Sequence, residues 1–296
     1  MAGAQEIKTR IKSIEETKKI TNAMYMIASS KMRQAKADLA ATEPYFFAQQ
    51  RAVSRFIDDF PESHAIYFGK DKPSEEMTRG YIVITADKGL SGAYNHNILR
   101  LAEEELGKHD KTKLYVVGEL GRQYFLNKKQ NVDGTFAYTA QNPTMFRARR
   151  VADEMLEGYL QDELDEVYIV YTRMINSFRM DPVVFRLLPL NRGLYVKDET
   201  EQNLQYIPLM SFHSTIENVL DQLMPNVVSG YIYGAMVESF ASEQNSRLMA
   251  MQTATDNAND MLHDLNIEYN RVRQAGITQQ ITEVVGGAKA LKKKQS

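Results

Sequence analysis

One segment of this 296-residue chain comes nearest to a chemical motif, the loop Asp87-Lys88-Gly89-Leu90-Ser91-Gly92. It follows an apolar run typical of a buried strand, and α/β sheets bind ligands outside the carboxyl ends of their strands. The loop lacks the full G-x-G-x-x-G pattern, and G-x-x-x-x-G-K-[ST] occurs nowhere in the chain. We therefore expect Asp87 to cap a turn or a helix N-terminus, and Gly89 and Gly92 to serve backbone geometry. Nucleotide binding at this loop remains an alternative.

No other pattern in the sequence predicts catalysis, a metal site or a cofactor. The chain has no cysteine, which excludes thiolate chemistry and suits a reducing compartment. Metal-ligand spacing is lacking among the five histidines, which are His64, His96, His109, His213 and His263. We find no Ser/His/Asp set and no placed carboxylate pair, so we expect the chain not to be an enzyme by itself.

Charge and hydropathy limit the classes of partner. A net charge of -2 argues against nucleic acid, and no apolar run approaches the roughly 20 residues that cross a bilayer. We also find no signal-peptide pattern, so we expect a peripheral or cytosolic chain. Residues 1–40 hold eight Lys and Arg against four acids. This basic stretch is either a solvated helix face or a surface that meets acidic loops of a partner.

Two long segments at opposite ends of the chain have the heptad spacing of a coiled coil, with alternating steps of four and three residues. In the first segment the repeat comprises Ile7, Ile11, Ile14, Lys18, Thr21, Tyr25, Ala28, Met32, Ala35 and Leu39. In the last it comprises Val237, Ala241, Gln244, Leu248, Met251, Thr255, Ala258, Leu262, Leu265, Tyr269, Val272 and Gly276. We expect the two segments to pair antiparallel in a left-handed supercoil, because a domain between them reverses the chain.

This repeat is poorly filled for a coiled coil whose only task is stability. Polar residues such as Lys18 and Gln244 and small ones such as Ala28 and Ala258 bury little apolar area. One interpretation is a weakly stable surface pair. The other is that further protein surfaces enclose the helices, for which methionines at 24, 26, 32, 249 and 251 would give adaptable contacts.

The middle of the chain predicts a mostly parallel α/β domain, because apolar strands alternate with helices. We expect strands at 81–85, 114–117, 166–174 and 183–190, and helices at 95–106, 121–129 and 144–160. The domain organisation is then an N-terminal coiled-coil helix (1–60), a Rossmann-like domain (75–200) and a C-terminal coiled-coil helix (206–290). We expect Pro44 to kink the first helix, Pro225 to break the last, and Gly286 and Gly287 to end it before a frayed tail.

Several motifs, in order along the whole chain, resemble those of the gamma subunit of F-type ATP synthases. Lys19 to Ala28 (K-I-T-N-A-M-Y-M-I-A) is similar to the family's K-I-T-x-A-M-x-M-V-A. Thr85 to Asn95 contains D-K-G-L-S-G, like the family's S-D-[RK]-G-L-x-G-x-x-N. The E-Q-x-x-R pattern from Glu243 to Ala258, and Y-N-R-V-R-Q-A-G-I-T from Tyr269, complete the resemblance.

The resemblance implies a central rotor shaft without an active site or cofactor of its own, coupling proton flow to ATP synthesis or hydrolysis. The implied partners are the alpha and beta subunits of the catalytic ring, the epsilon subunit and the membrane rotor ring. The implied location is the cytoplasmic side of the cell membrane, as a peripheral protein. The positions that the resemblance assigns to the ring interface are Lys19, Met24, Arg247, Met251, Arg273, Gln274, Thr278 and Gln280.

One position departs from the family pattern. Gln280 stands where the family usually has an acid, so an ion pair with the ring is not available there, although the amide can still make a polar contact. Two other functions remain open: an autonomous coiled-coil scaffold that needs no ring, and a small enzyme that binds its ligand near Asp87.

Overall fold

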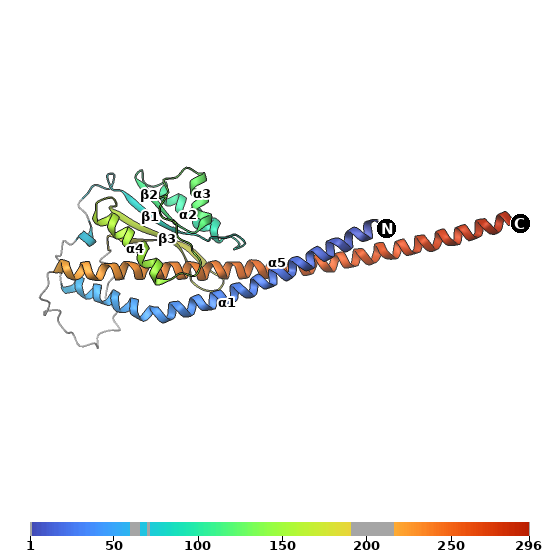
Figure 1. The fold of residues 1–296 in the computed structure, drawn as a ribbon, viewed down its shortest axis with the longest axis horizontal. Helices are drawn as coiled ribbons and strands as arrows, with labels where there is room; N and C mark the ends of the chain where they lie inside the picture. Colours follow the sequence, from blue (N-terminus) through green and yellow to red (C-terminus); the bar gives the residue numbers. More distant parts are fainter. Residues whose placement is uncertain (1, 60–65, 70–71, 191–215, 296) are drawn as a thin grey trace. The chain divides into compact units, whose positions relative to one another are not determined.

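The computed structural model describes residues 2–59, 66–69, 72–190 and 216–295. In the sequence, a long helix precedes an α/β region and another follows it (Figure 1). The elements in order are α1 (Ala2–Asp59), the 3-10 helix η1 (Ile66–Phe68), β1 (Arg79–Ile84), α2 (Tyr94–Leu106), β2 (Thr112–Val117), α3 (Glu119–Asn127), α4 (Met145–Leu160), β3 (Glu166–Met174), β4 (Met180–Leu188) and α5 (Ile216–Gln295). The chain divides into two compact units, one made of Met1–Ala28 with Leu248–Ser296 and the other of Ser29–Arg247.

The larger unit is built on a four-stranded sheet of order β2-β1-β3-β4. β1 pairs in parallel with both β2 and β3, whereas β4 pairs antiparallel with β3. All six residues of β1 are buried, as expected for the inner strand of a sheet covered on both faces. The predicted mostly parallel sheet is therefore confirmed, although β4 begins at Met180 rather than at residue 183.

Alternate residues of the strands enter two separate cores, because successive side chains point to opposite faces of a sheet. Tyr81 and Val83 pack in one cluster with Ile98 of α2 and Phe125 of α3. Ile82 and Ile84 belong to a larger cluster on the other face, which includes α4 and the part of α5 between Met224 and Ala241. Helices thus cover both faces, and α5 provides part of one layer.

Polar side chains of α5 complete the hydrogen bonding of β3 where β1 no longer reaches it. The pairing of β1 with β3 ends at Val170, so the next residues of β3 lack a strand partner on that side. Ser239 accepts a hydrogen bond from the Thr172 amide, and Ser242 donates to the Thr172 carbonyl, each at 3.2 Å. The Glu238 carboxylate accepts from the Met174 amide at 3.1 Å. These bonds explain why a buried helix carries so many polar residues, since unpaired buried backbone groups are costly.

In the smaller unit, α1 and α5 run in opposite directions (Figure 1) and have predicted heptad positions buried between them. The Oγ1 atoms of Thr21 and Thr255 lie 2.9 Å apart and share a hydrogen bond across the pair. Thr21, Ala28, Met251, Ala258 and Leu265 are buried, and the heptad positions Tyr25, Thr255 and Leu262 between them are half-buried. The expected fold class, paired terminal helices with a Rossmann-like α/β domain, is confirmed.

Three expected interruptions of the last helix were wrong. Pro225 lies inside α5, because the burial of Met224, Val227 and Val228 around it outweighs the loss of one backbone hydrogen bond. Gly286 and Gly287 also lie within α5, since glycine weakens a helix by only about 1 kcal/mol and does not forbid it. The tail expected to fray is helical as far as Gln295. Pro44 lies within α1, as expected, and the helix expected to begin near Pro208 falls outside the described residues.

Candidate functional site

The loop after β1 places Asp87 where its carboxylate joins three segments of the α/β region. It accepts hydrogen bonds from the amide of Glu119, the first residue of α3, and from the amides of Ala140 and Gln141. The Thr139 hydroxyl also donates to it. The predicted capping role of Asp87 is therefore confirmed, although the helix that it caps is α3 and not the helix that follows its own loop.

This arrangement opposes the idea of a phosphate site at the loop. A backbone amide at a helix start is a group that would bind a phosphate, and here the amide of Glu119 donates to a carboxylate of the chain itself. Among the residues that the structure describes, no three His, Asp or Glu side chains gather in a way that could hold a metal ion. The geometry gives the loop a structural role.

The remainder of the loop is held from its C-terminal side by Asn95. The Asn95 Oδ1 atom accepts from the Ala86 amide at 2.9 Å, and its Nδ2 donates to the Ser91 hydroxyl at 3.2 Å. Gly92 has a φ of 56°, so the expected backbone role of this glycine is confirmed. Gly89 has no such conformation, and a Cβ there would meet nothing within 4 Å. The left-handed residue that the sequence did not indicate is Leu90, with a φ of 63°.

Thr85 fixes the start of α3 against the end of β1, a role that the sequence reading missed. Its hydroxyl donates to the Val117 carbonyl at 3.0 Å and accepts from the Gly121 amide at 3.1 Å. A Cβ on Gly118 would lie 2.4 Å from the Thr85 carbonyl oxygen, and one on Gly121 would lie 2.5 Å from Thr85 Cγ2. Gly118 and Gly121 lie three residues apart directly after an apolar strand, and this spacing could have predicted the close approach.

Arg247 has its guanidinium inside the larger unit. Its Nη2 lies 2.6 Å from Glu243 Oε1, one helical turn earlier on α5, and donates to the carbonyls of Lys88 and Gly89 at 3.4 and 3.1 Å. The exposed fractions of the two side chains are only 11% and 4%. Burial raises the pKa of Glu243, and the positive charge of Arg247 opposes that rise. The conspicuous E-Q-x-x-R motif thus joins α5 to the Asp87 loop.

The other predicted interface positions lie on α1 and α5 in the smaller unit. Met251 is buried in the helix pair and Met24 is partly buried. The side chains of Lys19, Arg273, Gln274, Thr278 and Gln280 are exposed. The Thr278 hydroxyl donates to the Gln274 carbonyl one turn earlier at 3.0 Å. The exposed positions can meet a partner directly, and the buried ones cannot without a change in packing.

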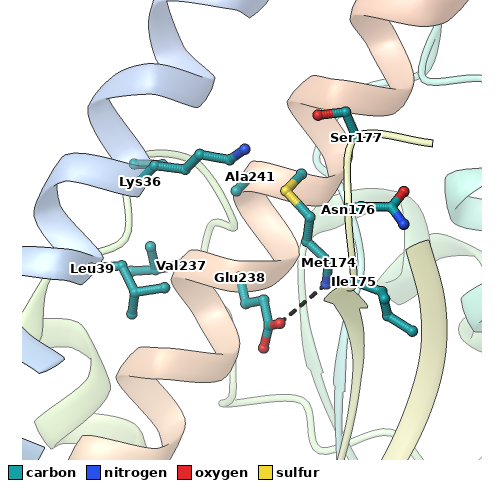
Figure 2. Close-up of a pocket in the computed structure, with 10 residues that line it drawn as sticks. Lys36, Leu39, Met174, Ile175, Asn176, Ser177, Val237, Glu238 and Ala241 are labelled. Carbon is teal, nitrogen blue, oxygen red and sulfur yellow. Dashed lines mark hydrogen bonds between the residues drawn. The ribbon is translucent and has the colours of Figure 1, made fainter. Parts of the chain in front are cut away.

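A shallow groove of about 310 Å³ lies between α1, α5 and the turn that joins β3 to β4 (Figure 2). Its charged groups are Lys36 of α1 and Glu238 of α5. Glu238 accepts from the Met174 amide, and burial raises its pKa. The rest of the lining is mostly apolar, with Leu39, Val237 and Ala241 on the helices. Nothing in this groove resembles a catalytic arrangement.

Within the described ranges, no helix combines the length and apolar composition needed to cross a membrane. The surface does carry an apolar stripe near the end of α5, formed by Ile277, Ile281, Val284 and Val285, all of them exposed. Thr21 pairs with Thr255, and the two helices are antiparallel. Ala2, the first residue of α1, therefore lies at the level of Gln274 on α5. The stripe therefore lies past the last position at which α1 can cover α5 in this register.

Comparisons with known proteins agree with the motifs. A family model described as ATP synthase matches residues 3–291. The chain is 41% identical over 288 residues to the ATP synthase gamma chain of Ruminiclostridium cellulolyticum, covering 97% of this chain and 98% of that one. It is 42% identical over 300 residues to the ATP synthase gamma chain of Acetivibrio thermocellus, covering 99% and 100%. A gamma chain of Acetobacterium woodii described as sodium ion specific is 36% identical over 299 residues, covering 97% and 98%.

Solved structures share the fold. A chain of the Euglena gracilis mitochondrial ATP synthase, from a structure of OSCP, F1 and the c-ring, aligns with a TM-score of 0.68 at 17% identity, covering 98% of this chain and 95% of that one. A chain from the central stalk and c-ring of the Tetrahymena thermophila enzyme aligns with a TM-score of 0.59 at 24% identity, covering 79% and 99%.

Proposed function

We propose that this chain, which belongs to the family of ATP synthase gamma chains, is the rotating shaft that couples ion flow to ATP synthesis and hydrolysis. The gamma chain is a non-catalytic subunit, and the catalytic sites of the enzyme lie on its beta subunits. In the proposed mechanism, rotation of an asymmetric shaft presents a different face to each catalytic site in turn. Each site then changes its nucleotide affinity through direct contact, which is a coupling free energy between distant sites.

The exposed apolar stripe on α5 is the observation that carries this proposal. Ile277, Ile281, Val284 and Val285 recur at the spacing of one helix face, where α1 no longer covers α5. Contiguous apolar side chains on the surface of a soluble protein mark an interaction site. A ring of alpha and beta subunits that encloses the helix end would bury this stripe.

Polar side chains near the apolar stripe would make further contacts with the ring. We propose that exposed Lys19, Arg273, Gln274, Thr278 and Gln280 contact ring subunits, with partly buried Met24 at the edge of that surface. Arg273 offers five donors in a planar fork that suits carboxylates. Arg247 and Met251 are buried within the chain, so we propose that they affect the ring through the packing of α5.

The epsilon subunit and the membrane rotor ring are the proposed partners of the α/β region, at the cytoplasmic face of the cell membrane. Protons are the proposed coupling ion, and the sodium-specific name of one relative makes sodium the alternative to test. The complete complex in liposomes distinguishes them: a proton gradient should drive ATP synthesis without sodium. Dependence of synthesis on a sodium gradient would contradict the proton assignment and leave the shaft function intact.

A reconstitution of the catalytic ring tests the shaft function. ATP turnover by alpha and beta subunits should rise when this chain is added, and Ile281→Glu should lower that rise because a charge would enter an apolar contact. Gln279→Glu, on the opposite face of the same helical turns, is the matched control and should leave turnover near the unmodified value. Equal effects of the two variants, or a chain that leaves turnover unchanged, would favour an autonomous scaffold.

A further inference from the structure

Met180, the first residue of β4, has an unusual environment for a thioether. Two side chains of α5 donate to its Sδ atom, Asn245 through Nδ2 at 3.3 Å and Ser246 through Oγ at 3.4 Å. Asn245 is only 3% exposed, and its Nδ2 also donates to the Ser177 carbonyl at 2.7 Å. The amide nitrogen carries two protons, so both of its bonds can form at once. Two polar groups of α5 are therefore directed at one sulfur atom.

These donors are poorly matched to a thioether, which is only a weak hydrogen-bond acceptor. A buried amide directed at a weak acceptor forfeits part of the free energy that a bond to oxygen would give. A methionine sulfoxide carries an oxygen on the same sulfur, and this oxygen is a polar acceptor. The unbranched Met180 side chain can adjust by rotation about its bonds to place that oxygen. The surroundings of Met180 thus suit the oxidised side chain better than the reduced one.

The position of Met180 leaves its thioether within reach of a dissolved oxidant. Met180 is half-buried, and it pairs with Met174 at the end of the β3–β4 ladder. The turn that follows this pair, residues 175–179, is exposed throughout. A small oxidant can therefore approach the sulfur from the turn side while the two donors hold it from the side of α5.

We propose that Met180 is a site of reversible oxidation by hydroperoxides, at which Asn245 and Ser246 bind the sulfoxide oxygen and hold the β3–β4 hairpin more firmly on α5. With hydrogen peroxide, a sulfur lone pair attacks one oxygen atom, and the S–O bond forms as the O–O bond breaks. The other oxygen leaves as water with both protons, so sulfur loses two electrons and the peroxide gains them. Methionine sulfoxide reductase and two thiols reverse the step, giving the thioether, a disulfide and water. The site is independent of the function proposed above.

Oxidation at this site stabilises the folded chain, whereas a sulfoxide in apolar surroundings disrupts packing. Met174 provides the internal comparison, because it is the strand partner of Met180 and is also half-buried. Met174 lines the mostly apolar groove together with Leu39 and Val237 (Figure 2). An oxygen on the Met174 sulfur would enter that apolar lining, so its oxidation should not stabilise the chain.

Partial oxidation followed by pulse proteolysis tests the site on the full-length chain. Hydrogen peroxide oxidises each reactive methionine in part, catalase removes the peroxide, and the sample is equilibrated in urea at its unfolding midpoint. A short pulse of thermolysin digests the unfolded molecules, and mass spectrometry compares each sulfoxide in the surviving chain and in the whole sample. Met180 sulfoxide should be enriched among the survivors, with an unfolding equilibrium constant about threefold or more below that of the thioether form. Met174 sulfoxide should show no enrichment.

Two serine variants, each studied at its own unfolding midpoint, identify the source of the effect. Ser246→Ala removes one donor and should reduce the enrichment of Met180 sulfoxide. Ser229→Ala is the matched control, because Ser229 donates to the carbonyls of Pro225 and Asn226 within α5, and it should keep the enrichment. Reductase with dithiothreitol should return Met180 to the thioether, and a persistent oxygen adduct would contradict reversibility.

Four other results would each overturn the proposal. Met180 could stay reduced in the folded chain under peroxide, or its sulfoxide could be evenly distributed or depleted among the survivors. Met174 sulfoxide could be enriched equally, which would assign the effect to the hairpin as a whole. The enrichment could also persist unchanged in Ser246→Ala, which would show that the donors of α5 do not bind the sulfoxide oxygen.

Discussion

Thr21 of α1 and Thr255 of α5 lie hydroxyl to hydroxyl, with their Oγ1 atoms 2.9 Å apart. Four residues on from Thr21 is Tyr25, and four residues back from Thr255 is Met251, so the same antiparallel register carries both predicted repeats without a gap. This single polar contact fixes how the smaller unit is assembled. A polar pair inside an otherwise weakly filled repeat is a recognised means of specifying register.

The register predicts a disulfide in this chain, which has no cysteine of its own. With Thr21→Cys and Thr255→Cys together, mild oxidation should give a crosslink, because the replaced oxygen atoms are in contact. Gel mobility without reductant, checked by mass spectrometry, measures it. Thr21→Cys with Leu262→Cys is the control, since one heptad displaces the partner by about 10 Å along the helix. Efficient crosslinking of the control pair would contradict the register.

Asp87 should contribute strongly to the stability of the α/β region. Asp87→Ala leaves the amides of Glu119, Ala140 and Gln141 without their acceptor, and we expect a loss of about 2–4 kcal/mol in unfolding free energy. Asp87→Asn should cost less, because one carbonyl oxygen remains. Denaturation in urea measures both. Asp181→Ala is the control, because Asp181 pairs with the exposed Arg179 and should cost less than about 1 kcal/mol.

Gly118 and Gly121 should tolerate no side chain. Gly118→Ala places a Cβ 2.4 Å from a backbone oxygen at a φ of 100°, and Gly121→Ala places one 2.5 Å from Thr85. We expect each to lower the unfolding free energy by about 1–3 kcal/mol or more, since overpacking forces the backbone to shift. The midpoint of urea unfolding measures the loss. Gly89→Ala, which has open space around its Cβ, should be close to neutral, and an equal loss there would contradict the explanation.

Glu238 should make the stability of the chain depend on pH. Burial raises its pKa above the ordinary value of 4.5, so the folded chain binds the proton more readily than the unfolded chain. Stability should therefore fall as pH rises from about 4.5 through the raised pKa, and change no further above it. Glu238→Gln still offers an acceptor to the Met174 amide and should flatten this part of the profile. Unfolding free energies measured from pH 4 to 8 test it, and an unaltered profile would exclude Glu238 as the source.

The sequence alone was sufficient for the helices, the strands and the pairing surface. Positions that are mostly apolar or small recur every 3.5 residues from Ile7 to Leu39 and from Val237 to Gly276, and a period of that kind depends only on local geometry. The sequence also predicted the family, because the family's motifs occur in order along the whole chain. Its errors concerned Pro225, Gly286 and Gly287, where local propensity favoured an end. The helix continues through Pro225 because the residues around it are buried, and through the two glycines because glycine weakens a helix without forbidding it.

The tertiary structure decided what individual motif residues do. Asp87 and Glu119 are 32 positions apart, and Arg247 is 158 positions from Gly89, so neither contact has a local signature. The polar residues of α5 from Glu238 to Ser242 likewise have meaning only beside β3, where they replace a missing strand. A buried polar side chain is placed by the partner that satisfies it, and that partner becomes identifiable only when the chain has folded.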